Sequence, residues 1–210
     1  MLSILSSTYF GPVQWYQKLQ RSEACLIEQH ENFVKQTYRN RCLIATANGT
    51  LSLSVPVEKP ADGRLDKTRM REVRISDHGD WRRIHWSALC AAYGESPFFE
   101  YYQDDIRPFF EKKYEFLFDF NMETTEKMIE LLDIRPKISI TEAYIQSKEL
   151  EEEDEIKDFR DAIRPKKPLP DAEFAPKRYY QVYEQKHGFQ PNMSILDLLF
   201  NEGNEAIFYL

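Results

Sequence analysis

Short apolar runs and helix-like spacing alternate at the start of the chain. Leu2–Ser6 is an apolar run, Val13–Leu19 places apolar residues at helical spacing, and Ala24–Glu28 is a second apolar run. A strand, a helix and a strand in this order favour a right-handed crossover, which sets the two strands parallel. The sequence therefore predicts a parallel strand pair, with Tyr9-Phe-Gly-Pro12 as the turn before the helix.

A β-hairpin is predicted next. Cys42–Thr46 and Leu51–Val55 are apolar-rich runs on either side of Asn48-Gly49. Hairpin turns prefer this dipeptide because both residues tolerate a positive φ. The polar stretch His30–Arg41 lies between the second strand and this hairpin, so strands hold it at both ends.

Helical patterns dominate after Asp80. Apolar residues from Trp81 to Ala92 recur at helical spacing, with Asp80 as the predicted N-cap and Gly94 at the C-terminal end. The other elements predicted in this part are a helix from Ser96-Pro97 to about Arg107, a helix from about Thr124 to Leu132, and short strands at Val73–Ile75 and Lys137–Ile140.

The last third of the chain is charged and proline-rich before it becomes helical again. Charge dominates Lys148–Asp154, and four prolines in Asp161–Lys177 exclude regular structure there. Helical patterns occupy Tyr179–His187 and Ile195–Leu210. The apolar end of the chain would be costly in water, so we expect it to dock on the body.

These elements predict an α/β fold. We expect a mixed sheet with parallel core strands and an inserted hairpin, followed by a helical layer and a helical C-terminal tail. We divide the chain into an α/β domain at 1–147, a charged, Pro-rich connector at 148–177, and a docked C-terminal helical segment at 178–210.

Composition narrows the function classes. The 35 acidic and 28 basic residues give a net charge of -7, which argues against a general nucleic-acid binder. No apolar run approaches the roughly 20 residues of a transmembrane helix, and the N-terminus lacks the features of a secretory signal. Cys25, Cys42 and Cys90 are far apart and form neither a disulfide framework nor a zinc pattern. We therefore expect a cytoplasmic protein without a metal or cofactor.

The polar stretch His30–Arg41 is the strongest candidate for binding. Lys35 and Arg41 offer positive charge, while Gln36 and Asn40 offer directional amides. This combination recognises carboxylate, phosphate or sugar hydroxyls. An exposed basic loop that leads into a hairpin is an equally good interpretation. Ligands of open α/β sheets gather at the carboxyl ends of strands, where this stretch would meet the Ser6–Gln14 turn.

His85 is the leading candidate for proton transfer. It lies on the buried stripe of the helix that starts at Trp81, where its surroundings can tune it as a general acid or base. A hydrogen-bonded structural histidine fits the same position. His30, beside Glu31 after a strand end, has the same two interpretations. The aromatic run Phe98–Tyr102 either forms a pocket wall or packs in the core.

Several motifs together resemble the WbqC-like protein family over nearly the whole chain. They are Tyr9-Phe-Gly-Pro12 with Gln14, Tyr38-Arg-Asn-Arg41, Leu53–Val57, Trp81 with His85, and Tyr93-Gly-Glu-Ser-Pro-Phe-Phe99. The family takes its name from genes of O-antigen and surface-polysaccharide clusters. By this resemblance Asn40 and Arg41 occupy an Asn-Arg motif, His85 is the helix histidine, and Tyr93 begins a Tyr-x-x-x-Pro motif. Gly94 and Glu95 depart from the basic or small residues of relatives.

Our leading hypothesis is a transferase of surface-polysaccharide assembly that moves an acyl or aminoacyl group onto a nucleotide-linked sugar or amino sugar. In that scheme His85 moves the proton, Asn40 fixes the reacting carbonyl or hydroxyl, and Tyr93 orients His85 or the substrate. The substrate is a small anionic sugar derivative. Its expected binding residues are Arg41, Lys35, Gln36, His30, Gln14 and Tyr9.

A second hypothesis belongs to a different class. The same polar residues would form a buried structural network that anchors the hairpin to the helices of a non-catalytic binding or assembly protein. Removing one partner from such a network costs about 1 to 3 kcal/mol. The two hypotheses differ in whether Asn40, Arg41 and His85 meet at an open pocket or are sealed inside.

Overall fold

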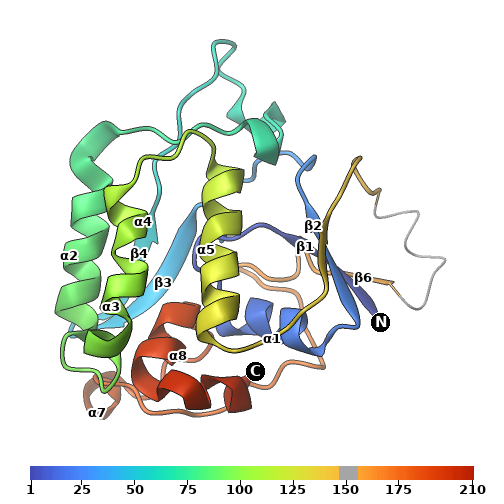
Figure 1. The fold of residues 1–210 in the computed structure, drawn as a ribbon. Helices are drawn as coiled ribbons and strands as arrows, with labels where there is room; N and C mark the ends of the chain where they lie inside the picture. Colours follow the sequence, from blue (N-terminus) through green and yellow to red (C-terminus); the bar gives the residue numbers. More distant parts are fainter. Residues whose placement is uncertain (147–155) are drawn as a thin grey trace.

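A computed structural model describes residues 1–146 and 156–210 of the chain. It confirms the α/β class. The strands form two separate sheets, and helices lie beside and between these sheets (Figure 1). One sheet has four strands in the order β5-β2-β1-β6, and the other has the two strands β3 and β4.

The four-stranded sheet is parallel throughout its described strands. Its members are β1 (Leu2–Ser6), β2 (Ala24–Glu28), β5 (Ile138–Ile140) and β6 (Ile156–Asp158). Helix α1 (Val13–Arg21) connects β1 to β2, which confirms the predicted crossover. Strand β5 confirms the strand predicted at Lys137–Ile140. We did not predict β6, which lies inside the stretch assigned to the connector. It pairs with β1 at the edge of the sheet.

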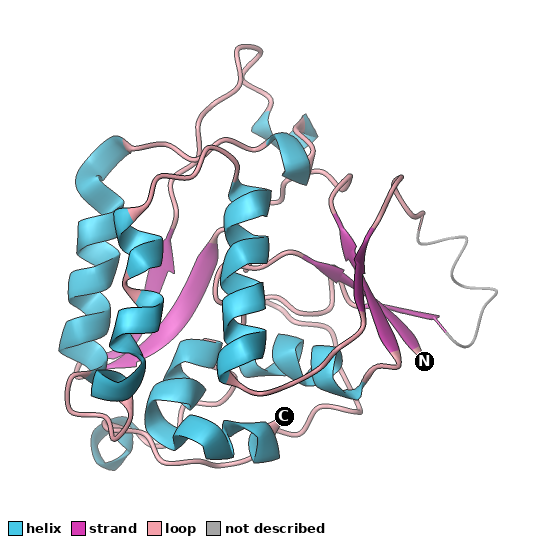
Figure 2. Cartoon of the chain, in the orientation of Figure 1, coloured by secondary structure: helices cyan, strands magenta, loops and turns pink. Residues whose placement is uncertain are grey.

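The predicted hairpin is confirmed. Strand β3 (Arg41–Thr46) pairs antiparallel with β4 (Gly49–Ser54), and Gly49 takes a positive φ of 97° at the turn. The hairpin forms its own two-stranded sheet, and Figure 2 shows it apart from the parallel strands with a long helix between them.

That long helix is α5 (Leu117–Leu131), one of four helices in the central part of the chain. The others are α2 (Trp81–Tyr93), α3 (Phe99–Ile106) and α4 (Pro108–Glu111). Asp80 occupies the predicted N-cap position of α2 but makes no side-chain capping bond, because its carboxylate pairs with Arg83. One predicted boundary is wrong. Helix α5 begins before the predicted start at Thr124, because Phe118 and Phe120 already pack in the core.

Two further predicted elements are smaller than expected. Val73–Ile75 makes only isolated bridges, Val57 to Ile75 and Arg74 to Phe116, instead of a strand. The helix predicted at Tyr179–His187 is the single turn α7 (Glu184–His187), since Tyr179 and Gln181 turn inward to bond a buried carboxylate. Three short 3-10 helices occupy Leu65–Lys67 (η1), Met70–Glu72 (η2) and His78–Asp80 (η3).

The C-terminal segment packs against the body. Helix α8 (Ile195–Glu202) and the 3-10 helix η4 (Gly203–Tyr209) bury Leu196, Leu199, Phe200 and Ala206 completely. Phe208, in contrast, is 71% exposed. The stretch 161–177 has no regular structure, as predicted, and the charged stretch 148–154 lies outside the described residues.

Candidate functional site

His85 is sealed in the interior. Its side chain is 4% exposed and lies between the rings of Trp81, Phe110 and Tyr9. Its Nδ1 atom lies 2.9 Å from the Tyr9 hydroxyl oxygen. Burial lowers the pKa of His85 to about 4, although a hydrogen bond with the Ser54 backbone acts in the opposite direction. His85 is therefore neutral at pH 7.

Two other predicted site residues take part in buried polar contacts. Tyr93 donates a hydrogen bond of 2.8 Å to Asp197, whose second carboxylate oxygen accepts from Tyr179 and Gln181. Burial raises the pKa of Asp197, and it also raises the pKa of Tyr93 well above its usual value. Gln14, 4% exposed, bonds Asp171 and Asn192.

Asn40 and Arg41 lie at the base of the hairpin. The Asn40 amide donates 2.9 Å to the Val55 carbonyl, which closes the hairpin beyond its strands. Arg41 is half-buried, and its Nε atom is buried without a hydrogen-bond partner among the described residues. The structure therefore does not bring Asn40, Arg41 and His85 to one open pocket.

The predicted meeting of two loops at the carboxyl edge of the parallel sheet does occur. The Tyr9 amide donates 2.9 Å to the Tyr38 carbonyl, so the loop after β1 lies beside the polar stretch after β2. In that stretch Lys35 and Gln36 are exposed, and Gln36 has a positive φ of 61° at the loop tip. His30 faces a pocket at the same edge.

This edge pocket has a volume of about 600 Å³. Loops after β2, β5 and β6 form it, together with the turn before η2. Its lining residues are His30, Glu31, Asn32, Val34, Arg39, Arg69, Glu142, Ala143, Tyr144 and Asp161. Ligand sites of open α/β sheets form in this position.

A buried ionic network supports the edge pocket. Arg39 grips both carboxylate oxygens of Glu31, at 2.9 and 2.5 Å. Arg160 grips Asp158 at 2.9 and 2.6 Å and reaches Glu28 at 3.4 Å. Burial raises the pKa of Glu31, although Arg39 acts to lower it. The paired charges fix the loops, because moving either arginine away from its carboxylate would leave a buried charge without a partner.

A second pocket, of about 710 Å³, adjoins the first. Arg69 lines both pockets, so they lie next to each other, and we call the two together the groove. The lining residues of the adjacent pocket are Gln29, Arg69, Arg71, Glu72, Phe116, Phe118, Asp119 and Ile140.

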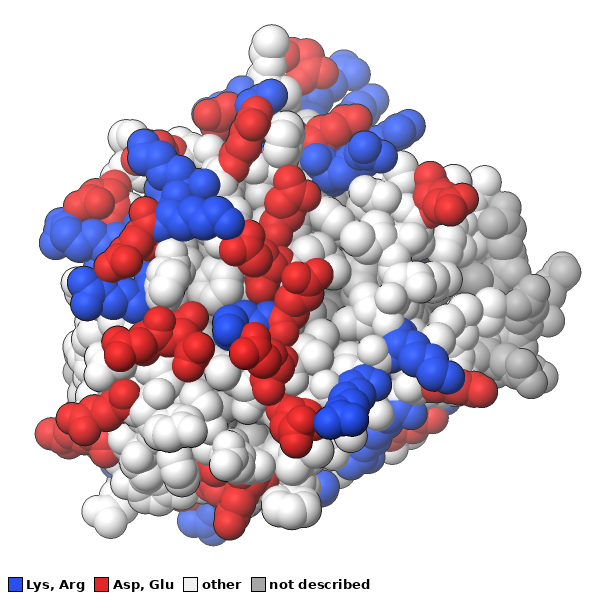
Figure 3. Space-filling model, viewed as in Figure 1, with Lys and Arg blue, Asp and Glu red and all other residues white. Residues whose placement is uncertain are grey.

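The groove borders a basic segment, residues 64–71. Arg64, Lys67, Arg69 and Arg71 are exposed, and none has an ion pair among the described residues. Asp66 is the one acidic residue among them in the sequence. Figure 3 shows lysines and arginines around the loop at the top of the molecule, with acidic residues among them. On a chain with a net charge of -7, this segment carries a local excess of positive charge.

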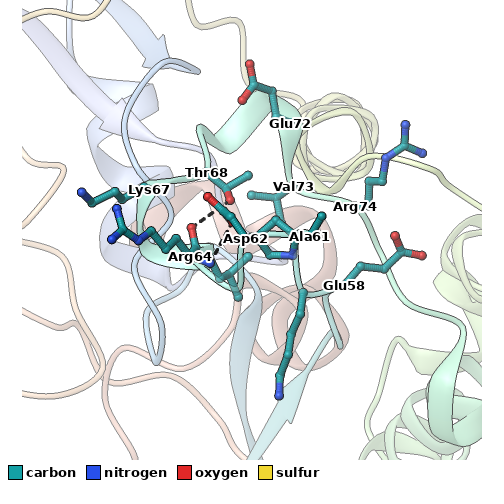
Figure 4. A pocket seen from close by; sticks show the side chains of 12 residues that line it. Glu58, Ala61, Asp62, Arg64, Lys67, Thr68, Glu72, Val73 and Arg74 are labelled. Carbon is teal, nitrogen blue, oxygen red and sulfur yellow. Dashed lines mark hydrogen bonds between the residues drawn. The ribbon is translucent and has the colours of Figure 1, made fainter.

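The loop that carries the basic segment also surrounds a pocket of about 640 Å³. Figure 4 shows its side chains, with Arg64 and Lys67 on one side and Glu58 and Arg74 on the other. All twelve lining residues belong to the stretch 58–74, and acidic and basic groups alternate around it. This loop pocket lies on a single stretch of chain, whereas the groove gathers residues from several elements. The groove is therefore the better candidate.

Comparison with known proteins agrees with the motifs. The model of the WbqC-like protein family matches residues 7–165 and 171–209. The chain belongs to this family. This WbqC-like protein is also similar to the uncharacterized protein Rv1507c of Mycobacterium tuberculosis (strain ATCC 25618 / H37Rv). The two are 25% identical over 227 residues, which cover 100% of this chain and 96% of that protein. No solved structure matches the chain.

The described residues contain neither a candidate membrane span nor a candidate metal cluster. None of the helices there combines the length and apolar character that crossing a membrane requires. No group of three or more His, Cys, Asp and Glu residues in the same part of the WbqC-like protein is placed to hold a metal ion.

Sequence analysis missed most of the groove. Arg69 and Arg71 follow Arg64 and Lys67 in a basic pattern along the sequence, and that pattern was the available signal. Tyr144 gave no signal, because only the folding of β5 beside β2 brings it to the edge pocket of the WbqC-like protein.

Proposed function

We propose that this WbqC-like protein is a cytoplasmic transferase of bacterial surface-polysaccharide biosynthesis, which moves an acyl or aminoacyl group onto a nucleotide-linked sugar. One observation carries the proposal: Arg69 lines two neighbouring pockets at the carboxyl edge of the parallel sheet and has no carboxylate partner among the described residues. A nucleotide-linked sugar has a diphosphate at its centre and a ring system at each end. The groove offers two neighbouring pockets and a cation that lines both.

Electrostatics and size support this ligand. Arg69 and Arg71 provide guanidinium groups, which bind phosphate oxygens through paired N–H donors. Each pocket is within the range of about 300 to 1,000 Å³ that small-molecule sites occupy. Glu142 and Asp161 in the edge pocket, and Asp119 in the adjacent one, supply acceptors for sugar hydroxyls.

Proton transfer falls to a different histidine than the motifs suggested. Transfer to an amine forms a C–N bond as the nitrogen attacks the carbonyl carbon of an acyl ester or thioester. The bond from that carbon to the donor oxygen or sulfur breaks, the base takes the proton from the nitrogen, and the donor leaves as an alcohol or thiol. His85 is buried and hydrogen-bonded to Tyr9, whereas His30 lines the edge pocket. In this scheme His30 is the base, and His85 holds the loop after β1 in place.

A thermal-shift titration with UDP-glucose tests the proposal. Ligands that bind only the folded state raise its apparent stability. We expect a shift in the wild type, and about fivefold weaker binding in Arg69→Ala and Arg71→Ala through the lost phosphate contacts. Arg135→Ala is the matched control, since Arg135 is 91% exposed and precedes β5 at the opposite edge of the sheet.

A second function is favoured by a specific observation. His85, Tyr93 and Asn40 all make hydrogen bonds inside the protein, to Tyr9, Asp197 and Val55. In this alternative they anchor the hairpin in a non-catalytic binding protein. The absence of any nucleotide-dependent shift in the wild type would favour it over the transferase.

A further inference from the structure

Tyr144 presents an aromatic ring to the edge pocket. It follows β5 and is 52% exposed. The guanidinium carbon of Arg160 lies 5.2 Å from the ring centroid and covers part of the ring. No hydrogen bond of the Tyr144 hydroxyl occurs among the described residues. The part of the ring that Arg160 does not cover has surface available for a ligand.

The loop that carries Tyr144 is held on both sides of this residue. Thr141 donates 2.8 Å to one carboxylate oxygen of Glu28, and the Ile145 amide donates 3.0 Å to the other. Arg160 donates 2.8 Å to the Ile145 carbonyl and is itself fixed by Asp158. The ring therefore stays in one place before a ligand arrives, which lowers the entropy cost of binding.

The other aromatic residues of the groove are less suited to contact a ligand. Phe116 is half-buried, and the guanidinium of Arg74 lies 4.9 Å from its ring centroid. Phe118 is 4% exposed. Tyr144 thus combines exposure with a fixed position on the same side of Arg69 as His30.

We propose that Tyr144 stacks on the base of a nucleoside diphosphate whose phosphates lie against Arg69. The inference rests on the proposed function and specifies it, because it places the base of the nucleotide against Tyr144 in the edge pocket. Every base has a flat π-face, and stacking on an aromatic side chain contributes to binding of any of them.

Two sources supply this chemistry. A nucleotide-linked sugar and coenzyme A both contain a nucleoside with a 5′-diphosphate. UDP-glucose and dTDP-glucose represent the first source, and coenzyme A the second. Glucose 1-phosphate has a sugar and a phosphate but no base, so it reports on the anion site alone.

Calorimetric titration of these four compounds tests the inference on the wild type, Tyr144→Leu and Tyr144→Phe. We expect Tyr144→Leu to bind the nucleotides about tenfold more weakly, because base stacking is lost. Tyr144→Phe keeps the ring and should bind like the wild type. Glucose 1-phosphate should bind all three equally. Tyr101→Leu is the matched control, since Tyr101 is 73% exposed on α3.

The outcomes separate this inference from the transferase proposal. Equal nucleotide binding by the wild type and Tyr144→Leu overturns the stacking role and leaves the transferase proposal standing. Glucose 1-phosphate binding that needs Arg69, without nucleotide binding, overturns both the stacking role and the nucleotide-linked substrate, and leaves only an anion site at Arg69. No binding of any of the four compounds overturns both. A Tyr144-dependent preference for coenzyme A supports stacking and identifies the donor as the ligand. Unchanged melting of Tyr144→Leu confirms that this variant is folded.

Discussion

Tyr9 and His85 are joined by a hydrogen bond in which 2.9 Å separates the hydroxyl oxygen from Nδ1. Tyr9 belongs to the loop after β1, and His85 to helix α2, so the bond ties the carboxyl edge of the parallel sheet to the central helices. Burial raises the pKa of Tyr9 well above its usual value, which keeps the hydroxyl protonated. The hydroxyl then donates to Nδ1 of a neutral imidazole, while the other ring nitrogen faces the Ser54 backbone.

The first prediction follows from the neutral state of His85. Its pKa falls from 6.5 to about 4 on folding, so the unfolded chain binds the extra proton more readily between these values. The stability that neutral His85 contributes is fully present above pH 6.5 and is lost as pH falls toward 4, a change of up to about 3 kcal/mol. Urea unfolding of the wild type and His85→Gln between pH 4.5 and 7.5 measures it.

The difference in unfolding free energy between these two proteins should shrink as pH falls. Other titrating groups are common to both, so they cancel in this comparison. A difference that stays constant over the range would show that His85 is not buried in its neutral form.

The second prediction concerns Tyr93. Its hydroxyl donates to buried Asp197 and accepts from the Ala45 amide at 3.3 Å, which connects α2, α8 and the hairpin. Tyr93→Phe removes one donor from a carboxylate that stays buried, at a cost of about 1 to 3 kcal/mol. We expect the melting temperature to fall by several degrees while the affinity for nucleotides stays unchanged. Unchanged melting with lost binding would instead return Tyr93 to the ligand site.

The third prediction concerns the connector, which a buried ion pair fastens to α1. Lys18 Nζ lies 2.7 Å from Asp171, and the side chains are only 2% and 7% exposed. Asp171→Ala leaves the lysine nearly uncompensated, with only Glu173 at 3.7 Å as a partner, so we expect a loss of about 3 kcal/mol. Chemical unfolding gives this value, and limited proteolysis should show faster cleavage within residues 161–177.

A double variant separates the effect of the unpaired charge on stability from the effect of the other contacts of Asp171. Lys18→Met with Asp171→Leu removes both charges and keeps apolar contact, so it should recover part of the lost stability. If the double variant is no more stable than Asp171→Ala, the hydrogen bond of Asp171 with Gln14 is the dominant contact instead.

The elements that sequence analysis predicted correctly depend on local patterns. Asn48-Gly49 specifies its own turn, and the β1–α1–β2 unit follows from apolar spacing and a chain-handedness rule. The missed features depend on distant partners. Strand β6 exists through pairing with β1, and Tyr179 leaves a helical pattern to reach Asp197.

The candidate site was predicted less well for the same reason. The meeting of the two loops at the carboxyl edge was foreseen, because that edge follows from topology. The sequence did not predict whether a polar residue faces a pocket or the core. Sequence spacing shows which face of a helix or strand a residue occupies, but not which other elements cover that face. His85 and His30 show this: α2 buries the first, and the end of β2 leaves the second beside a pocket.

The fourth prediction tests the ion pair behind the edge pocket. Glu31 is 6% exposed, and burial already raises its pKa in the presence of Arg39. Arg39→Met removes the cation that compensates the Glu31 carboxylate. Burial of Glu31 is then costly when the carboxylate is ionised and much less costly when it is protonated. A raised pKa favours folding at low pH and loses that contribution as pH rises, so the variant should be destabilised by about 3 kcal/mol at pH 8 and by less at pH 5. Adding Glu31→Gln should remove this pH dependence. Equal destabilisation at both pH values would mean that Arg39 acts through packing, not through charge.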